Sequence, residues 1–310
     1  MKDEEKGKRG RIMKLLTYIY HGREDFGVLC KNGEFLCSAG AVCQGSYRSL
    51  AELIAALSTE DRQRLEAAAA ADPPSLGLPA VPFAEAVLCA PIPEPAQDVI
   101  CLGLNYAGHA RESARFKKGS FEAGEQAVYF AKRVDRAVGC GGFIDSHPGV
   151  VDSLDYEVEL AAVIGREARK VSPEKAWDHV FGYTIINDVS ARNVQTRHKQ
   201  WFFGKSLDTF CPMGPWIVTA DEFRRPPLLK ITSRVNGETR QESDTGMMIF
   251  GVDHVISELS QAMTLKSGTV IAMGTPAGVG MGFVPPRFLK PGDVVECEIE
   301  GIGCLTNTVK

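Results

Sequence analysis

The segment Asp155-Tyr-Glu157-Val-Glu159 constrains this chain more than any other, because it places three acids at alternate positions before an apolar run. In a β-strand, alternate residues point to the same face and lie about 6.6 Å apart. The run that follows, residues 160–165, is typical of a buried strand. Carboxylates gathered at the mouth of a core repel one another and are costly to desolvate unless a cation neutralises them. The pattern therefore predicts a cation site at the start of a buried strand.

A further acid, Asp188, follows a second apolar stretch, residues 180–186. No His or Cys accompanies these hard oxygen ligands, so Mg²⁺ or Mn²⁺ suits them better than zinc. Two alternatives stay open: acids that alternate on a strand are most often its solvated face, and Asn187-Asp188-Val-Ser is turn and helix-cap chemistry. We favour the cation site because each acid group borders a strand too apolar to lie at an exposed edge.

Composition limits the class of protein. A chain of 310 residues exceeds a typical single core, so we expect one large domain and a smaller one. Its formal charge of -4 offers no basic patch for nucleic acid, and no apolar run approaches the roughly 20 residues that span a membrane. The nine cysteines form no C-x-x-C pair, which favours reduced, mostly buried thiols in a cytoplasmic protein.

The organisation of the chain changes once, at a proline-rich segment. We expect a disordered leader at residues 1–12, a small N-terminal domain at 13–72, a linker at 73–90 and a catalytic domain at 91–310. The small domain should contain strands at 14–20 and 26–30 and a helix at 49–57 capped by Ser49. Later, residues 228–235 read as a strand entering an Asn236-Gly237 hairpin. Regular βαβ alternation is missing, which disfavours a dinucleotide fold.

Five ordered motifs give a more specific signal. They are Cys101-Leu-Gly-Leu-Asn-Tyr-Ala-Gly-His109, Leu154-Asp-Tyr-Glu-Val-Glu-Leu160, Asn187-Asp-Val-Ser-Ala-Arg-Asn-Val-Gln195, Gly204-Lys-Ser-Leu-Asp-Thr-Phe-Cys-Pro-Met-Gly-Pro215 and Gly274-Thr-Pro-Ala-Gly-Val-Gly280. With these, residues 89–310 resemble the fumarylacetoacetate hydrolase family, whose short bacterial members include acylpyruvate hydrolases and 2-hydroxyhepta-2,4-diene-1,7-dioate isomerases. The resemblance implies an α+β fold: a mixed β-sandwich roll with a small N-terminal α/β domain. It also implies a homodimer.

The motif His109-Ala-Arg-Glu112 suggests an acid–base pair. On a helix, residues at i and i+3 face the same way, so Glu112 can hold one ring nitrogen of His109 and leave the other to act on water. An ordinary exposed helix with a solvated pair is the alternative. The resemblance implies a His-Glu pair on a segment that orders over the metal when substrate binds, and we expect residues 111–124 to form that lid.

The resemblance also implies roles for the remaining motif residues. A lysine beside aromatic residues most often extends over apolar surface, but the family places Lys205 in the metal site, where it binds a substrate carboxylate or oxyanion. Arg192 is expected to form a buried structural ion pair, and Asn193 departs from the aspartate frequent in relatives. The expected metal ligands are Glu157, Glu159 and Asp188, and the expected substrate-binding residues are Gln195, Gly274 and Thr275.

These parts predict a Mg²⁺- or Mn²⁺-dependent hydrolase that cleaves the carbon–carbon bond of a 2,4-diketo acid, of acylpyruvate or fumarylpyruvate type, through a metal-chelated enolate. The expected partner is thus a small keto or diketo acid, with no nucleic acid and no membrane. A 2-hydroxydienoate isomerase, an oxaloacetate-type decarboxylase and a sugar-acid dehydratase or lyase use the same site. A non-catalytic binding protein is disfavoured because the acids, His109 and Lys205 are all present.

Overall fold

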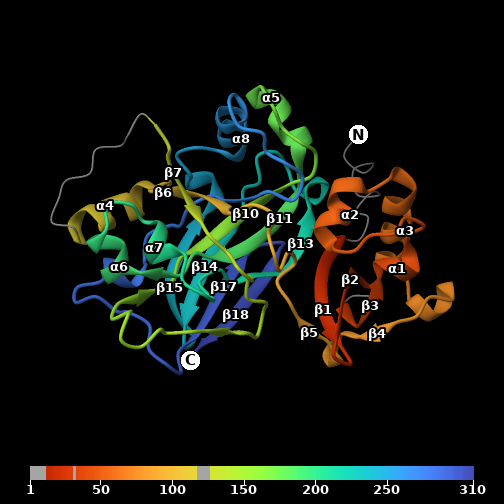
Figure 1. The fold of residues 1–310 in the computed structure, drawn as a ribbon, viewed down its shortest axis with the longest axis horizontal. Coiled ribbons are helices and arrows are strands. Elements are labelled where there is room, and N and C mark those ends of the chain that lie inside the picture. The colour runs from red at the N-terminus through yellow and green to blue at the C-terminus, as the bar shows by residue number, and fades with distance from the viewer. Residues whose placement is uncertain (1–11, 31–32, 117–125) are drawn as a thin grey trace, which may run out of the picture.

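The computed structural model describes residues 12–30, 33–116 and 126–310. Residues 1–11 of the predicted leader and 117–124 of the predicted lid lie outside them. Within the described residues the protein is built on two main sheets with short helices around them (Figure 1). This mixture of sheets and helices confirms the α+β class.

The larger sheet has eleven strands in the part of the chain that the structure describes. Across the sheet these are β4 (Val81–Pro82), β3 (Phe35–Ser38), β2 (Arg23–Cys30), β1 (Lys14–Tyr20), β13 (Met213–Thr219), β11 (Val180–Asn187), β10 (Val158–Ile164), β16 (Val270–Ala272), β6 (Val99–Gly103) and β7 (Val128–Lys132), with β5 (Val87–Leu88) paired to β1. Neighbours are antiparallel except β16 and β6, so the sheet is mixed.

A smaller sheet contains β15 (Glu238–Asp244), β14 (Lys230–Val235), β17 (Val294–Ile299), β18 (Gly303–Val309) and β8 (Phe143–Ile144). The predicted hairpin is confirmed: Asn236 and Gly237 join β14 to β15 with φ angles of 52° and 76°, the left-handed values that a tight hairpin turn needs. A separate two-stranded pair, β9 (Leu154–Asp155) with β12 (Ser190–Ala191), lies beside the acidic segment.

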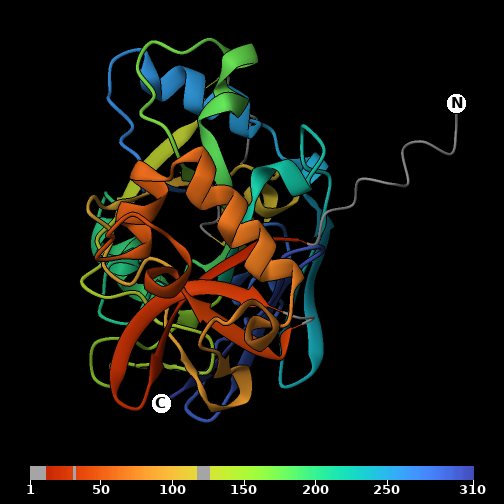
Figure 2. The ribbon, with the colours of Figure 1, turned by 90° about the vertical axis from the view of Figure 1, so that its right-hand side faces the viewer.

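The helices are short. They are α1 (Ala39–Val42), α2 (Leu50–Ala56), α3 (Thr59–Ala70), α4 (Ala107–Phe116), α5 (Pro173–Ala176), α6 (Arg192–Arg197), α7 (Phe202–Lys205) and α8 (Val252–Ser260). The predicted cap is present, since the Ser49 side chain accepts a hydrogen bond from the backbone N–H of Glu52. Figure 2 shows the N-terminal helices, in orange, in front of the strands that they cover. No helix in the described ranges is long and apolar enough to cross a membrane.

Strand β10 lies at the centre of the fold and is buried on both faces. Its residues Leu160, Ala162 and Ile164 pack in the core shared with the smaller sheet, whereas Ala161 and Val163 pack in the core shared with the N-terminal helices. Two-sided burial explains why this strand reads as a continuous apolar run. An acid at its start is therefore surrounded by core.

One prediction about organisation needs correction. The acidic segment is not one continuous strand, because the extended pairing breaks at Tyr156 and Glu157, between β9 and β10. Within the proline-rich segment 73–90, β4 and β5 pair with β3 and β1. Strand β1 pairs in turn with β13, so the sheet is continuous across the expected domain boundary. The division at 73–90 stays a prediction.

Candidate metal centre and active site

Three carboxylates meet at the start of β10. Glu157 precedes the strand, Glu159 is its second residue, and Asp188 directly follows β11, the antiparallel neighbour. The N–H of Glu157 donates to the Asn187 side chain and the N–H of Asp188 donates to the Glu157 carbonyl, both at 2.9 Å. These bonds fix the two strand ends side by side. One oxygen from each of the three acids then lies within 4.8 Å of the others.

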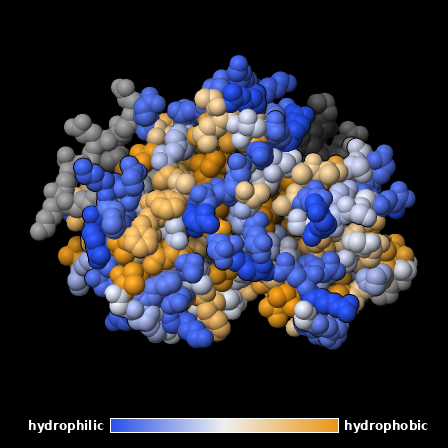
Figure 3. All heavy atoms as spheres, in the orientation of Figure 1, coloured by the Kyte–Doolittle hydropathy of each residue, from blue (hydrophilic) through white to orange (hydrophobic). Residues whose placement is uncertain are grey.

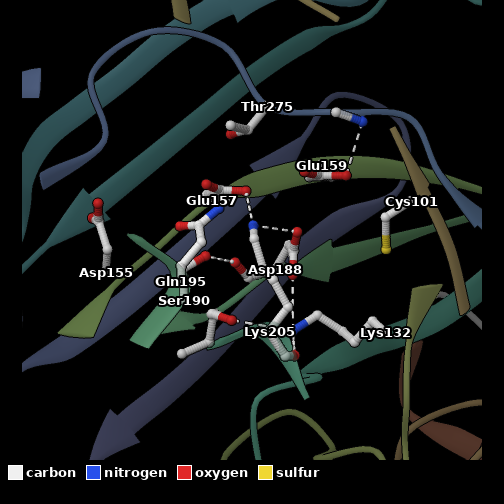
Figure 4. A network of polar contacts seen from close by, with 12 residues as sticks. Cys101, Lys132, Asp155, Glu157, Glu159, Asp188, Ser190, Gln195, Lys205 and Thr275 are labelled. Atoms are coloured by element: carbon white, nitrogen blue, oxygen red, sulfur yellow. Dashed lines mark hydrogen bonds and ion pairs between the residues drawn. The ribbon is translucent and has the colours of Figure 1, made fainter. Parts of the chain in front are cut away.

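Asp155 points away from this group (Figure 4). Its carboxylate accepts from the N–H groups of Gly280 and Met281 at 2.6 and 3.0 Å and from Arg192 Nε at 2.8 Å. The prediction that all three alternating acids share one face is therefore wrong, because the break at Tyr156 turns the chain between Asp155 and Glu157. The predicted buried ion pair of Arg192 is confirmed by its contact with Asp155.

Two of the three carboxylates of the cluster, Glu157 and Asp188, contact cationic side chains. The Lys205 ammonium lies 2.7 Å from Glu157 Oε2 and 2.6 Å from Asp188 Oδ2, and Arg192 Nη2 lies 2.6 Å from Glu157 Oε1. Both cations are 2% exposed as side chains, so these contacts are little screened by water. Lys205 thus points into the acidic cluster, as the family resemblance implied (Figure 4).

The pKa values of Glu157 and Glu159 shift in opposite directions although both side chains are buried. Burial opposes ionisation of Glu157, but the neighbouring cations of Lys205 and Arg192 outweigh it, so its pKa lies below the ordinary value. For Glu159, burial and then the negative charges of Asp188 and Glu157 raise the pKa well above the ordinary value. Glu159 is thus the acid of the cluster whose charge is poorly compensated.

This arrangement fits a divalent cation. The donors are all carboxylate oxygens, which Mg²⁺ and Mn²⁺ prefer. The Lys205 ammonium already lies between Glu157 and Asp188, so these two acids accept a cation at that point. A further positive charge would also relieve the repulsion that raises the pKa of Glu159. Glu157, Glu159 and Asp188 are therefore the residues that would hold the ion.

Gly274 orients Glu159. Its N–H donates to Glu159 Oε2 at 2.8 Å, and its φ of 89° lies in the region that favours glycine. A β-carbon there would also lie 2.8 Å from the β-carbon of Asn105, which is too close. The motif that starts at Gly274 is therefore a tight turn, and this turn positions a cluster acid. Its predicted contact with substrate stays a prediction.

Helix α4 carries the expected acid–base pair. His109 and Glu112 share a helix face, but Nδ1 of His109 is 3.8 Å from Glu112 Oε2, which is longer than a hydrogen bond. Glu112 instead accepts from the Gly278 N–H at 3.0 Å, which fastens α4 to the 274–280 turn. The Nδ1 atom of His109 is buried and has no hydrogen-bond partner among the described residues. It remains available for a proton.

The two predicted substrate-binding side chains differ in availability. Oε1 of Gln195 accepts from Arg192 Nη1 at 3.0 Å, so the donor that its amide offers to a substrate oxygen is Nε2. The Thr275 hydroxyl donates to the Val158 carbonyl at 2.9 Å and accepts from Gln241 Nε2 at 2.7 Å. To donate to a substrate carboxylate it would have to leave Val158.

One narrow cavity joins these groups. Its walls come from the end of β6, helices α4, α6 and α7, strand β7 and the 274–281 turn, and the lining side chains that bear on chemistry are His109, Glu157, Glu159, Gln195, Lys205 and Thr275. Leu104, also in the wall, has a φ of 59°, a strained value for a non-glycine residue and typical of functional sites. In Figure 3, hydrophobic residues gather over the region of α6 and α7, where Phe202 and Phe203 are exposed.

Sequence reasoning missed two residues near the cluster. Lys132, at the end of β7, is fully buried and lies 2.8 Å from Asp188 Oδ1. Gln241 is fully buried on strand β15, whose other residues are exposed or half-buried. It forms hydrogen bonds with Thr275, Ser233 and the N–H of Val158. The available signal for Lys132 was its place after the apolar stretch Val128–Ala131, on the same strand face as Phe130.

Comparisons with known proteins identify the family of this chain. Residues 98–310 match the family described as fumarylacetoacetate (FAA) hydrolase C-terminal. Oxaloacetate tautomerase YisK of Bacillus subtilis is 47% identical over 227 residues, which are 73% of this chain and 74% of that protein.

Solved structures extend the similarity to nearly the whole chain. A fumarylacetoacetate hydrolase from Exiguobacterium antarcticum has a TM-score of 0.81 at 41% identity, covering 96% of this chain and 99% of that one. A 2-hydroxyhepta-2,4-diene-1,7-dioate isomerase from Mycobacterium marinum has a TM-score of 0.70 at 30% identity, covering 96% and 98%. The match over residues 98–310 and these relatives confirm the resemblance: the chain belongs to the fumarylacetoacetate hydrolase family.

Proposed function

We propose that this protein is a divalent-cation-dependent enzyme that converts the enol and keto forms of a 2-oxo dicarboxylic acid such as oxaloacetate. The observation that carries the proposal is the convergence of Glu157, Glu159 and Asp188 in a buried cluster that shares one cavity with Lys205 and His109. The relative that is 47% identical bears the name oxaloacetate tautomerase, which favours this reaction over the others that the site supports.

The proposed ion is Mg²⁺ or Mn²⁺, held by Glu157, Glu159 and Asp188. When bound, the ion supplies a positive charge that binds the oxygens of a 2-oxo acid and stabilises its enolate. The chain supplies the other parts. We assign to Lys205 a hydrogen bond to a substrate oxyanion and to Gln195 Nε2 a hydrogen bond to a second substrate oxygen, since both side chains line the cavity.

Tautomerisation requires a proton to leave the enol oxygen and a proton to reach carbon 3. We assign the proton transfer at carbon 3 to His109, whose buried Nδ1 has no hydrogen-bond partner within the described part of the chain and whose ring lines the cavity. Glu112 Oε2 lies 3.8 Å from His109 Nδ1 and accepts a hydrogen bond from the Gly278 N–H, so we assign it no proton transfer.

Hydrolysis of the carbon–carbon bond in an acylpyruvate is the second candidate, and the same His109 favours it. A base beside an acid can activate water for attack on the distal carbonyl, after which the pyruvate enolate leaves with the bonding electrons. The 41% identical fumarylacetoacetate hydrolase supports this candidate. The two reactions differ in whether water is consumed, so one assay separates them.

The test uses the full chain after EDTA treatment, resupplied with Mg²⁺ or Mn²⁺. We expect enol-oxaloacetate absorbance to decay faster with metal and protein together than with either alone. Acetylpyruvate, assayed in parallel for released pyruvate, reports the hydrolase candidate. Glu242→Gln, a change at an exposed acid on β15, is the matched control and should retain activity. A protein that binds Mn²⁺ yet accelerates neither reaction would refute the proposed function, and one that binds no Mn²⁺ would refute the metal site.

A further inference from the structure

A second buried lysine, Lys132, lies behind the acidic cluster. Its side chain is 0% exposed, at the end of β7 in the centre of the molecule. Phe130, two residues earlier on the same strand face, lines the active-site cavity. Lys132 itself is not among the residues that line the cavity. Removing an ammonium group from water costs several kcal/mol unless nearby groups compensate for its charge, so a lysine kept here needs an explanation.

Two of the partners of Lys132, Asp188 and Lys205, belong to the site. Its ammonium forms an ion pair with Asp188 Oδ1 at 2.8 Å and donates to the carbonyl of Val189, the next residue, at 3.1 Å. It also donates to the carbonyl of Lys205 and, at 2.8 Å, to that of Phe210. One cation thus joins the segment that carries Asp188 to the segment that carries the cavity lysine (Figure 4).

The two carboxylate oxygens of Asp188 contact different lysines. Lys132 takes Oδ1 from behind, whereas Lys205 contacts Oδ2 at 2.6 Å from the cavity side. With one oxygen held at a buried point, the carboxylate cannot rotate freely, and Oδ2 stays beside the Lys205 ammonium that also contacts Glu157. Because Lys132 also holds the Lys205 carbonyl, it limits where the Lys205 side chain starts.

We infer that Lys132 is a positioning residue of this site: it fixes the orientation of Asp188 and the backbone of Lys205, and so sets the affinity of the cluster for a divalent cation. This inference rests on the proposed function, because it concerns the same cluster. Lys132 does not line the cavity, so its effect on the cation would pass through Asp188 and Lys205, two of the residues that it contacts. Residues that orient metal ligands typically contribute about 10- to 100-fold to metal affinity.

A purely structural role makes a different prediction, and Asn307 provides the comparison. Asn307 is also buried and also ties two backbone carbonyls, those of Gly139 and Gly142, at 2.9 and 3.2 Å. It lies on β18 of the smaller sheet and bonds none of the cluster acids. Loss of Asn307 should lower stability without changing metal affinity, whereas loss of Lys132 should change both.

The experiment titrates Mn²⁺ by calorimetry into the full-length wild type and the variants Lys132→Met, Lys132→Gln and Asn307→Leu, with a urea unfolding curve for each. Methionine keeps the length of the side chain without its charge or its donors. Glutamine keeps two donors for the carbonyls but not the charge. We expect both Lys132 variants to bind Mn²⁺ about 10- to 100-fold more weakly, and Asn307→Leu to bind it as the wild type does.

Each outcome decides the inference. Wild-type Mn²⁺ affinity in a folded Lys132→Met or Lys132→Gln would overturn it. Weaker binding in Asn307→Leu as well would show a general effect of destabilisation and overturn it too. If neither Lys132 variant folds, the role is structural and the inference is wrong. If the wild type itself binds no Mn²⁺, the proposed metal site fails, a result that the wild-type titration reports separately from the variants.

Discussion

Asp155 and Glu159 lie four residues apart on the same acidic segment, both almost fully buried, yet the protein treats them differently. Asp155 accepts from the N–H groups of Tyr156, Gly280 and Met281 and from Arg192. Glu159 accepts from the Gly274 N–H. Among the described residues, no lysine or arginine forms an ion pair with its carboxylate. One acid is saturated with donors and the other is not.

The difference in hydrogen-bond donors indicates different roles. Asp155 stabilises the fold, whereas Glu159 would gain from a bound cation. A buried carboxylate with several donors is stable as an anion and has little to gain from a further cation. Burial and two neighbouring anions raise the pKa of Glu159, which accepts from one N–H. A bound cation would therefore stabilise its charged form. Burial and residue type alone did not distinguish the two. The number of hydrogen-bond donors around each carboxylate distinguished Asp155 from Glu159.

Neutralising Glu159 should have the largest effect on activity and on Mn²⁺ binding. Glu159→Gln keeps the acceptor for the Gly274 N–H but removes a ligand charge. Charge stabilisation by a metal contributes several kcal/mol, and about 1.4 kcal/mol is tenfold in rate, so activity should fall by about 10³-fold or more. Calorimetry should show Mn²⁺ binding lost, while the metal-free variant unfolds at a urea concentration no lower than wild type, since a like charge has been removed. Wild-type Mn²⁺ affinity in this variant would remove Glu159 from the site.

His109→Ala tests the proton rather than the charge. Loss of a general acid or base typically costs about 10²- to 10⁴-fold in rate, and we expect that range for oxaloacetate tautomerisation and for any acylpyruvate cleavage. The three carboxylates are untouched, so Mn²⁺ affinity should stay at the wild-type value in the same calorimetric assay. A variant that retains the wild-type rate would show that His109 moves no proton in the reaction.

Asp155→Ala should lower the free energy of unfolding, because Asp155 stabilises the fold. It leaves the Arg192 guanidinium without its Asp155 partner and the N–H groups of Gly280 and Met281 without their acceptor. Removing one partner of a buried ion pair typically costs about 3 to 5 kcal/mol, and we expect a loss of that size in the free energy of unfolding from urea titration. Asp155→Asn retains an acceptor oxygen and should lose less. A loss below about 1 kcal/mol for the alanine variant would contradict the structural role.

Much of this molecule follows from local sequence. The strands predicted at residues 14–20 and 180–186 are β1 and most of β11, and the Ser49 cap and the Asn236-Gly237 turn are where the pattern put them. Each of these depends on residues close together in the chain, through strand periodicity, side-chain capping or left-handed turn conformations. Family motifs likewise placed the cluster acids and Lys205.

What escaped prediction depends on residues far apart in the chain. The break between β9 and β10 is fixed by the Asn187 side chain and by the N–H groups of Gly280 and Met281, some 30 and 125 positions away. Lys132 looks like any lysine that ends a strand until carbonyls from residues 189, 205 and 210 surround it. Alternation in the sequence states which residues share a face. It does not state which buried acid will receive donors.

The smallest expected effect concerns Asp61 of α3, a saturated acid far from the site. Its carboxylate accepts from the N–H groups of Gln44 and Gly45 and from the Tyr47 hydroxyl, and the Gln44 bond, followed by that of Tyr47, lowers its pKa. A lowered folded-state pKa means that its contribution to stability is present above the ordinary value of about 3.8 and is lost as pH falls through the folded value.

The difference in unfolding free energy between wild type and Asp61→Asn should therefore be full near pH 6 and shrink as pH falls below about 4, because the unfolded chain takes up the proton first. Urea titrations across that range measure it. Ser49→Ala is the matched control: it removes a neutral cap worth about 1 kcal/mol, and its effect should not vary with pH. A difference for Asp61→Asn that stays constant with pH would show that the hydrogen bonds stabilise the loop without depending on the charge. Asp61 would then not be a charged counterpart of Asp155, and the contrast with Glu159 would rest on Asp155 alone.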